Sequence, residues 1–233
     1  MFTVALIGED GAGKTTVAKR LVQSLPWPSR YLYMGLSVLT SNMPLPTTLV
    51  ARYIKLLSHR IKGGKSGQTH ISRETKKRGN LWLMIRFINR MAEIWWRQLI
   101  SWSYQLQGFV VVYDRHFLFE TAIDDKAEES KEKVFDRLEY WIVNKAYPKP
   151  DLVIVLDAPA KVLYTRKGEG TIEYLKKRKE LTQKKGEDVQ HLAIVDASQP
   201  LEQVIADVTQ HIVEFKASGK VNSTSQVSVN NNR

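Results

Sequence analysis

The sequence contains no cysteine. Disulfide bonds and thiolate metal sites are therefore excluded, and this composition is typical of proteins in the reducing cytosol. The N-terminus has no signal-peptide pattern, because residues 2–7 form a short run of β-forming side chains directly after the initiating methionine. We expect a cytoplasmic protein.

The most apolar long stretch, residues 81–107, is not an uninterrupted hydrophobic run. It has helical spacing and many tryptophans, but three arginines and Glu93 interrupt it. This pattern favours a helix that packs in the core or against a second copy in a homodimer. Peripheral contact with a lipid surface is the alternative, since Trp and Arg favour that boundary. The side chains concerned are Trp82, Arg86, Arg90, Trp95, Trp96, Arg97 and Trp102.

The composition otherwise suits one globular α/β domain. The chain has 233 residues, of which 43% are hydrophobic, and this is enough for a sizeable core. Its formal net charge is +11, so we expect anionic partners. The charge alone does not choose among nucleotides, nucleic acid and a membrane surface.

A glycine-rich loop near the N-terminus carries the strongest chemical signal. Residues 8–15 match the pattern G-x-x-x-x-G-K-S/T, in which backbone N–H groups converge on phosphate oxygens at the positive end of a helix dipole. A strand-like run precedes the loop and helical spacing follows it, which is the context that this motif requires. Lys14 is expected to reach the β- and γ-phosphates, and Thr15 to place its hydroxyl on Mg²⁺. The loop predicts a nucleotide-dependent phosphotransferase.

Strand and helix patterns alternate along the rest of the chain. This order predicts an α/β fold with a parallel sheet of about five strands flanked by helices. Beyond the first strand at 2–7, strands are expected at residues 31–34, 109–113, 152–156 and 192–195. Helices are expected at residues 15–25, 49–61, 81–107, 120–146, 160–167, 168–185 and 201–215. We expect one domain over residues 1–215, with an insertion at about 44–79, and a disordered tail at 216–233.

Acidic residues close two of the expected strands. Asp114, which Arg115 follows, ends one strand, and Asp157 ends another. Parallel sheets bind ligands at the carboxyl ends of their strands, so either aspartate is placed to hold the water shell of Mg²⁺ beside the loop. For Asp114 and Arg115 a functional role is favoured over an ion pair or a cap. For Asp157, a structural role as a cap or turn before Pro159 is as well supported as a functional role.

Several motifs, in their order along the chain, resemble the thymidylate kinase family of P-loop nucleoside monophosphate kinases. The loop at residues 8–16 is similar to that family's loop, and residues 114–116 read D-R-H, similar to its D-R-Y or D-R-H motif. Residues 150–157 (P-D-L-V-I-V-L-D) and 195–197 (V-D-A) resemble its later strands. The resemblance implies a three-layer P-loop kinase fold with a basic lid at about 165–185, and ATP and Mg²⁺ as cofactors.

The resemblance also implies a role for each matching residue. Asp10 would hold a hydroxyl of the acceptor sugar, and Arg115 would bind the acceptor phosphate or the transferring phosphoryl group. Family members with glycine at position 11 supply the catalytic positive charge from the lid, which implies Lys167 and Arg178. The implied catalytic residues are thus Lys14, Arg115, Lys167 and Arg178, and the implied Mg²⁺ ligands are Thr15 and Asp114. The implied ATP-binding residues are Gly8, Asp10, Gly11, Ala12, Gly13, Lys14, Thr15, Thr16 and Arg166.

The middle of the chain departs from the family pattern. Thymidylate kinases commonly carry an arginine after the second strand that grips the acceptor's phosphate, whereas residues 34–40 contain no basic residue. The long helix is expected to offer an arginine and an aromatic platform to the nucleobase, and the candidates are Arg86, Phe87, Arg90 and Arg97. Two acceptor classes therefore stay open: a nucleoside monophosphate such as dTMP, and a nucleoside, sugar or glycan group.

A regulatory module that binds a nucleotide or a nucleic acid is a third hypothesis. Its support is the net charge and the many Lys and Arg residues at 60–78. Nucleic acid is not expected as a partner, because that stretch has no interleaved Phe, Tyr or Trp on which bases stack.

Overall fold

The computed structural model describes most of the chain. The described residues are 1–35, 42–46, 80–120, 132–167, 171–186 and 188–219. Strands run over Thr3–Gly8 (β1), Ser29–Tyr33 (β2), Val110–Asp114 (β3), Leu152–Asp157 (β4) and Leu192–Asp196 (β5). Helices run over Lys14–Ser24 (α1), Asn80–Leu106 (α3), Phe117–Glu120 (α4), Glu132–Lys145 (α5), Ala160–Lys167 (α6), Ile172–Gly186 (α7) and Leu201–Ala217 (α8).

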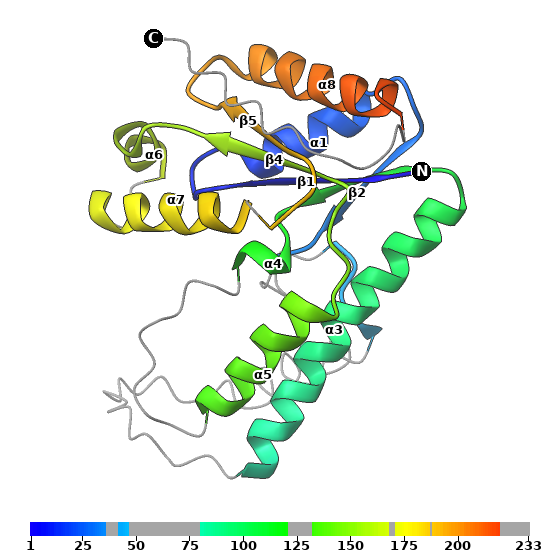
Figure 1. Cartoon of the computed structure of the whole chain (residues 1–233), viewed down its shortest axis with the longest axis vertical. Coiled ribbons are helices and arrows are strands. Elements are labelled where there is room, and N and C mark those ends of the chain that lie inside the picture. The colour runs from blue at the N-terminus through cyan, green and yellow to red at the C-terminus, as the bar shows by residue number, and fades with distance from the viewer. Residues whose placement is uncertain (36–41, 47–79, 121–131, 168–170, 187, 220–233) are drawn as a thin grey trace, which may run out of the picture.

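The described strands form one parallel sheet of five strands in the order β2-β3-β1-β4-β5 (Figure 1). This confirms the predicted α/β fold. Strands in such a sheet are apolar throughout because both faces are covered, and all residues of β3 are buried. The helices supply the long connections that parallel strands require.

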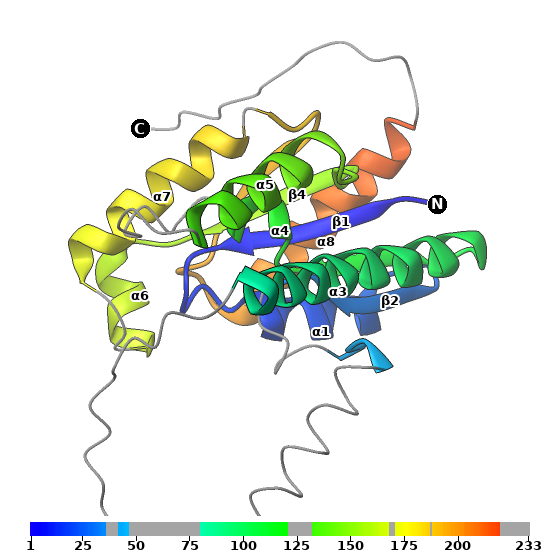
Figure 2. The ribbon, with the colours of Figure 1, turned by 90° about the horizontal axis from the view of Figure 1, so that it is seen from below.

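Alternate residues of the central strand enter two separate cores. Val4 and Leu6 of β1 belong to the core under α1 and α8. Ala5 and Ile7 belong to the core on the opposite face, under α3 and α5. Figure 2, seen from below, shows α3 and α5 lying across this second face. Helices therefore cover both faces of the sheet, which gives the three layers that the sequence predicts.

The carboxyl ends of β1, β3 and β4 lie at one edge of the sheet. In the parallel register Leu6 pairs with Asp114, and Gly8 pairs with Leu156. The chain leaves β1 toward α1 on one face and leaves β3 toward α4 and α5 on the other. Such divergence between neighbouring strands marks the place where open α/β sheets bind ligands. Helices α6 and α7 lie at the same edge (Figure 1).

The long helix α3 buries a different face from the one that its apolar spacing predicts. Glu93, Arg97, Gln98 and Ser101 are buried together with Ile94. Packing in the core therefore describes Leu83 and Ile94, whereas several other apolar side chains of α3 are exposed in the single chain. These exposed side chains are Met84, Ile85, Ile88, Leu99, Trp102 and Leu106. Contact of this face with a second copy or with lipid stays a prediction.

Some boundaries differ from the predicted ones. The short helix α4 has no counterpart among the predicted elements, and α8 continues to Ala217, past its predicted end and into the predicted tail. The helix predicted at 49–61, most of the insertion at 44–79 and the rest of the tail lie outside the described residues. Within the parts that the structure describes, no helix is long and apolar enough to cross a membrane.

Candidate active site

The glycine-rich loop between β1 and α1 packs against β4 and α6. Gly8 has a φ of 144° and Gly11 a φ of 93°, values that favour glycine. A side-chain carbon at Gly8 would run into Leu156 O, and one at Gly11 would come 2.9 Å from Leu163 O. The loop therefore needs glycine at both positions, for space as well as for backbone conformation.

Lys14 begins α1 and folds back into this loop. Its Nζ donates to the carbonyl oxygens of Gly8 (2.9 Å) and Glu9 (2.7 Å), and lies 3.8 Å from Asp10 Oδ1. Burial lowers the pKa of Lys14 to about 8, and the positive charge of Arg115 acts in the same direction. The ammonium group is thus held inside the loop that the sequence predicts to bind phosphate.

Thr15 and Asp114, the two predicted Mg²⁺ ligands, are in contact. Thr15 Oγ1 donates a hydrogen bond of 2.7 Å to Asp114 Oδ2, and Tyr31 OH on β2 donates one of 2.8 Å to the same oxygen. Burial and the charge of Asp114 raise the pKa of Tyr31, so its hydroxyl stays a donor. Asp114 is fully buried, and its Oδ1 has no hydrogen-bond partner among the described residues.

This arrangement fits a magnesium ion. A buried carboxylate oxygen without a hydrogen bond is suited to a cation. Proteins usually hold Mg²⁺ with one or two side chains, and substrate phosphates and water complete the shell. Thr15 and Asp114 supply such a partial set, and the described part of the chain contains no group of three His, Cys, Asp or Glu side chains that holds a metal by itself.

Arg115 follows Asp114 in a strained backbone conformation. Its φ is 69°. Among the described residues, Arg115 is the only residue other than glycine with a positive φ. Its backbone N–H donates to Leu6 O (3.0 Å), which fixes the turn after β3. Its guanidinium lies between two carboxylates, with Nη2 2.8 Å from Asp10 Oδ1 and Nη1 2.8 Å from Glu120 Oε1. Arg115 therefore joins the glycine-rich loop to α4.

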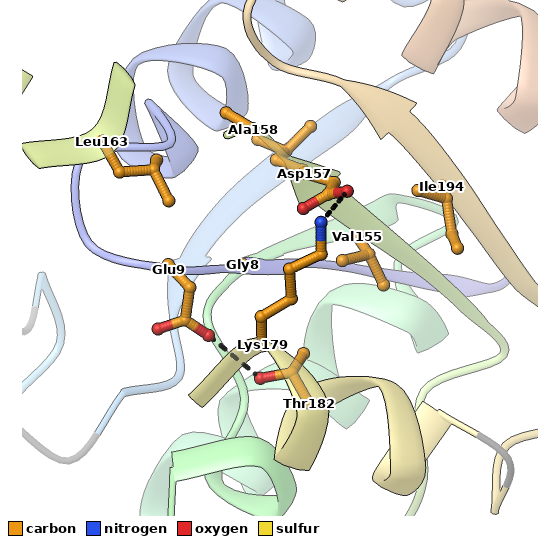
Figure 3. A pocket seen from close by; sticks show the side chains of 10 residues that line it. Gly8, Glu9, Val155, Asp157, Ala158, Leu163, Lys179, Thr182 and Ile194 are labelled. Carbon is orange, nitrogen blue, oxygen red and sulfur yellow. Dashed lines mark hydrogen bonds and ion pairs between the residues drawn. The ribbon is translucent and has the colours of Figure 1, made fainter. Parts of the chain in front are cut away.

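Helix α7, which forms much of the predicted basic lid, is attached to two strand ends. Arg178 Nε lies 2.9 Å from Glu9 Oε2, and Thr182 Oγ1 donates to Glu9 Oε1 (3.2 Å). Lys179 Nζ lies 2.7 Å from Asp157 Oδ2 at the end of β4. Figure 3 shows the Thr182–Glu9 and Lys179–Asp157 contacts in the walls of one small pocket. Asp157 is thus paired with a lid lysine, whereas Asp114 faces the loop hydroxyl.

Arg97 is a buried arginine that lies near Arg115, just after the end of β2. Arg97 of α3 is 1% exposed, its Nη1 donates to Gly35 O (2.5 Å), and its Nη2 lies 3.6 Å from Glu93 Oε2. A side-chain carbon on Gly35 would come 2.8 Å from Arg115 Cδ, so the two arginines flank this glycine. By contrast, Arg90 pairs with Glu139 of α5, at 2.7 Å. Of these two predicted base-binding candidates, Arg97 is the one beside Arg115.

The structure brings most of the predicted site residues together. The residues that meet at the loop and the strand ends are Gly8, Asp10, Gly11, Ala12, Gly13, Lys14, Thr15, Asp114 and Arg115, with Arg178 attached through Glu9. Thr16 is exposed on α1. Arg166 instead contacts the loop after β5, where its Nη1 donates to Ala197 O (2.8 Å). Lys167 ends α6, and its side chain lies outside the described part of the structure.

No protein-family model matches this chain, and no curated relative matches it. Solved structures do match. A thymidylate kinase from Candida albicans is 18% identical with a TM-score of 0.55, and the match covers 97% of this chain and 96% of that one. A deoxyadenosine kinase from M. mycoides, solved with the products dCMP and a flexible dCDP, is 14% identical with a TM-score of 0.50, over 91% of this chain and 99% of that one. This chain has the P-loop kinase fold. At such identities the likeness concerns the fold alone.

Within this P-loop kinase fold, Glu9, Tyr31 and Glu120 are the site residues that the sequence reasoning missed. The loop pattern accepts any residue at position 9, so the pattern does not identify Glu9 as a functional residue. Tyr31 reaches Asp114 across the β2–β3 pairing, which the sequence alone does not reveal. For Glu120 there is a weak signal, because it is an acid five residues after Arg115.

Proposed function

We propose that this protein transfers the γ-phosphoryl group of ATP to a small acceptor molecule. The observation that carries the proposal is the contact between Thr15 and Asp114, because it sets a hydroxyl and a buried carboxylate beside the glycine-rich loop. Lys14 lies in the same loop. An ATP-dependent kinase needs these groups in one place: backbone N–H groups and a lysine for the phosphates, and oxygen ligands for Mg²⁺.

In the proposed reaction the residues of the chain position charge. Thr15 and Asp114 would hold Mg²⁺, which would neutralise part of the charge of the ATP phosphates. Lys14 binds the same phosphates, whose negative charge raises its pKa again and keeps it cationic. Arg115 and Arg178, which are bound to the neighbouring loop residues Asp10 and Glu9, face the transferring group. The acceptor oxygen forms a bond to the γ-phosphorus while the bond between this phosphorus and the bridging oxygen of ADP breaks. An acceptor that attacks through a hydroxyl also gives up its proton, whereas a phosphate dianion has none to lose.

A nucleoside monophosphate such as dTMP is the first candidate acceptor. Its support is the resemblance of the loop and of the D-R-H run to thymidylate kinases, together with the fold shared with the Candida albicans thymidylate kinase. In this version Asp10 accepts a hydrogen bond from the acceptor sugar, and Arg115 binds the acceptor phosphate.

A nucleoside or a sugar, phosphorylated on a hydroxyl group, is the second candidate acceptor. Asp10 and Glu120 both bind Arg115, so two carboxylates already match its one positive charge. Arg97 is likewise occupied by Gly35 O and Glu93. Among the residues that the structure describes, this side of the site therefore has no surplus of positive charge for a phosphate dianion. A carboxylate is, in contrast, suited to accept the proton of an attacking hydroxyl.

A panel of acceptors separates these candidates. The protein is incubated with Mg²⁺-ATP and with nucleoside monophosphates, nucleosides or sugars, and ADP release is measured. Stimulation by dTMP supports the first candidate, and stimulation by a nucleoside or sugar supports the second. Tight ATP binding without stimulation by any acceptor would instead favour a nucleotide-binding regulatory module.

Asp10→Asn provides the matched variant for the acceptor side. We expect it to raise the KM for the accepted substrate by about 10-fold or more and to leave the KM for ATP within about twofold, because Asp10 contacts Arg115 on the acceptor side of the loop. An equal rise of both KM values would mean that Asp10 serves the donor site.

The homodimer and the cytoplasmic location stay predictions. The exposed apolar side chains of α3 support an interface between two copies, and the molecular mass in solution tests it. Peripheral membrane contact through the same helix is the alternative, and co-sedimentation with lipid vesicles tests that.

A further inference from the structure

The glycine-rich loop carries a buried acid next to its first glycine. Glu9 is 5% exposed and directly follows Gly8. A carboxylate at this position repels the phosphates that the loop is proposed to bind. The loop pattern does not require it, because any residue satisfies that position.

Glu9 contacts two of the cations that are proposed to act in phosphoryl transfer, Lys14 and Arg178. Its backbone oxygen accepts a hydrogen bond from Lys14 Nζ at 2.7 Å. Its side-chain oxygens meet Arg178 Nε at 2.9 Å and Thr182 Oγ1 at 3.2 Å. One residue therefore holds the loop lysine through its main chain and the lid arginine through its side chain.

The charge of Glu9 does not favour folding. Burial raises the pKa of this carboxyl, and the neighbouring Asp10 raises it further, while Arg178, Thr182 and Lys14 oppose the shift. The net direction is upward, so the fold favours the neutral form over the charged one. A neutral side chain of the same shape would then suit the fold at least as well. The presence of an acid at position 9 is therefore better explained by its contact with Arg178 than by a contribution to the stability of the fold.

We propose that Glu9 is a positioning residue, whose carboxylate holds the Arg178 guanidinium beside the phosphate loop for the transferring phosphoryl group. This inference rests on the proposed phosphotransferase function. The carboxylate lies 2.9 Å from Nε of the guanidinium, and this ion pair keeps the cation close to the loop. Thr182 holds the other carboxylate oxygen and thereby orients Glu9 itself.

The neighbouring lid cation offers a matched control. Lys179 follows Arg178 on α7, but it pairs with Asp157 at the end of β4 instead of with the loop. Lys179→Met therefore removes one positive charge and one attachment of the same helix without touching Glu9.

The decisive measurement is a steady-state comparison of the full-length wild type, Glu9→Gln, Arg178→Ala, the double mutant and Lys179→Met. We expect Glu9→Gln to lower kcat by about 10-fold or more with less than about a twofold change in the KM for ATP, because orientation matters mostly in the transition state. In the Arg178→Ala background, Glu9→Gln is expected to change kcat by less than about twofold, since the group it positions is absent. Lys179→Met is expected to keep kcat within about threefold of wild type.

Two kinetic outcomes overturn the proposal. A higher kcat in Glu9→Gln would mean that Glu9 withholds Arg178 from the reaction instead of positioning it. Full additivity of the two substitutions in the double mutant would mean that the two residues act separately. Thermal unfolding is the control for a structural effect, and we expect Glu9→Gln to melt at or above the wild-type temperature.

Hydrogen exchange separates this proposal from the proposed function. The backbone amides of Ile172–Gly186 are compared between wild type and Glu9→Gln, and we expect faster exchange in the variant because an attachment of α7 is lost. If wild type phosphorylates no acceptor, the proposed function fails. Equal exchange in the two proteins would overturn the role of Glu9, whatever the activity shows.

The pH dependence of kcat is a second measurement, and it would not change between wild type and Glu9→Gln if Glu9 had a purely structural role. The pair with Arg178 needs the ionised carboxylate, and the pKa of Glu9 is raised. As the pH falls, kcat of the wild type should therefore decline at a higher pH than an ordinary glutamate would cause. The charged groups that face Glu9 are Arg178 from α7 and Lys14 and Asp10 from the loop. Glu9→Gln is expected to lose this decline, and an unchanged acid limb would contradict the proposal.

Discussion

Thr15 Oγ1 and Asp114 Oδ2 are joined by a hydrogen bond of 2.7 Å between residues 99 positions apart in the sequence. The parallel register of β1 and β3 makes this contact, because it sets Leu6 beside Asp114 and so brings the start of α1 to the end of β3. Tyr31 from β2 holds the same oxygen, which leaves Oδ1 of Asp114 without a hydrogen bond among the described residues. The proposed Mg²⁺ site therefore depends on the order of the strands as well as on the two residues.

Asp114→Asn is expected to lower kcat by about 10²-fold or more while the Kd for ATP changes only a few-fold. The amide keeps the shape of the side chain, but it removes the charge that positions Mg²⁺, whereas the loop still binds the phosphates. Turnover and ATP binding are measured separately, and the kcat is followed as a function of Mg²⁺ concentration. Asp157→Asn is the matched control, because Asp157 ends the neighbouring β4 and pairs with Lys179. A larger loss of turnover in Asp157→Asn would assign the metal to the other strand end.

Lys14→Met is expected to abolish phosphoryl transfer and to leave the fold intact. Methionine keeps most of the apolar stem of this buried side chain, and the contacts it loses are those of the ammonium group with the carbonyl oxygens of Gly8 and Glu9. Circular dichroism and thermal unfolding check the fold, and ADP release with the best acceptor checks the activity. Turnover near the wild-type level in a folded variant would rule out the phosphate-binding role of the loop.

Much of the fold follows from local patterns in the sequence. Central strands such as β3 and β4 are continuous apolar runs that end in an acid, and this pattern identifies buried parallel strands without knowledge of their partners. Glycines at 8 and 11 take the positive φ that the loop pattern requires. These features depend on neighbouring residues along the chain, which is why the sequence alone predicts them.

Contacts between distant elements are what the sequence could not predict. In α3 the buried face includes Glu93 and Arg97, because their charged groups satisfy each other and the backbone of neighbouring segments. A periodicity argument assigns such residues to solvent and is wrong there. Glu9 was missed for a similar reason, since its partner Arg178 lies on α7, far along the chain.

Arg178→Ala is expected to lower kcat by about 10²-fold or more with little change in ATP affinity. Gly11 leaves the loop without a cationic side chain at that position, so the charge that develops on the transferring group needs a cation from elsewhere. Arg178 is attached to the loop through Glu9, and a guanidinium offers two donors at once to phosphoryl oxygens. Steady-state kinetics and nucleotide binding are measured on this variant and on Lys167→Ala. Equal turnover of wild type, both single mutants and their double mutant would mean that the lid is only a solvated basic helix.

Arg97→Met is expected to reduce the free energy of unfolding by about 3–5 kcal/mol, the range for breaking a buried ion pair. The substitution leaves the buried Glu93 without its cation and Gly35 O without its donor. Equilibrium unfolding in urea measures the change, and Arg137→Met on the exposed face of α5 is the control, expected within about 0.5 kcal/mol of wild type. The double substitution Arg97→Met with Glu93→Met removes both charges and should recover part of the loss, because two apolar side chains replace an unpaired buried carboxylate. Wild-type stability of Arg97→Met would show that the guanidinium does not hold α3 against the end of β2, and the buried charge would then be better explained by acceptor binding.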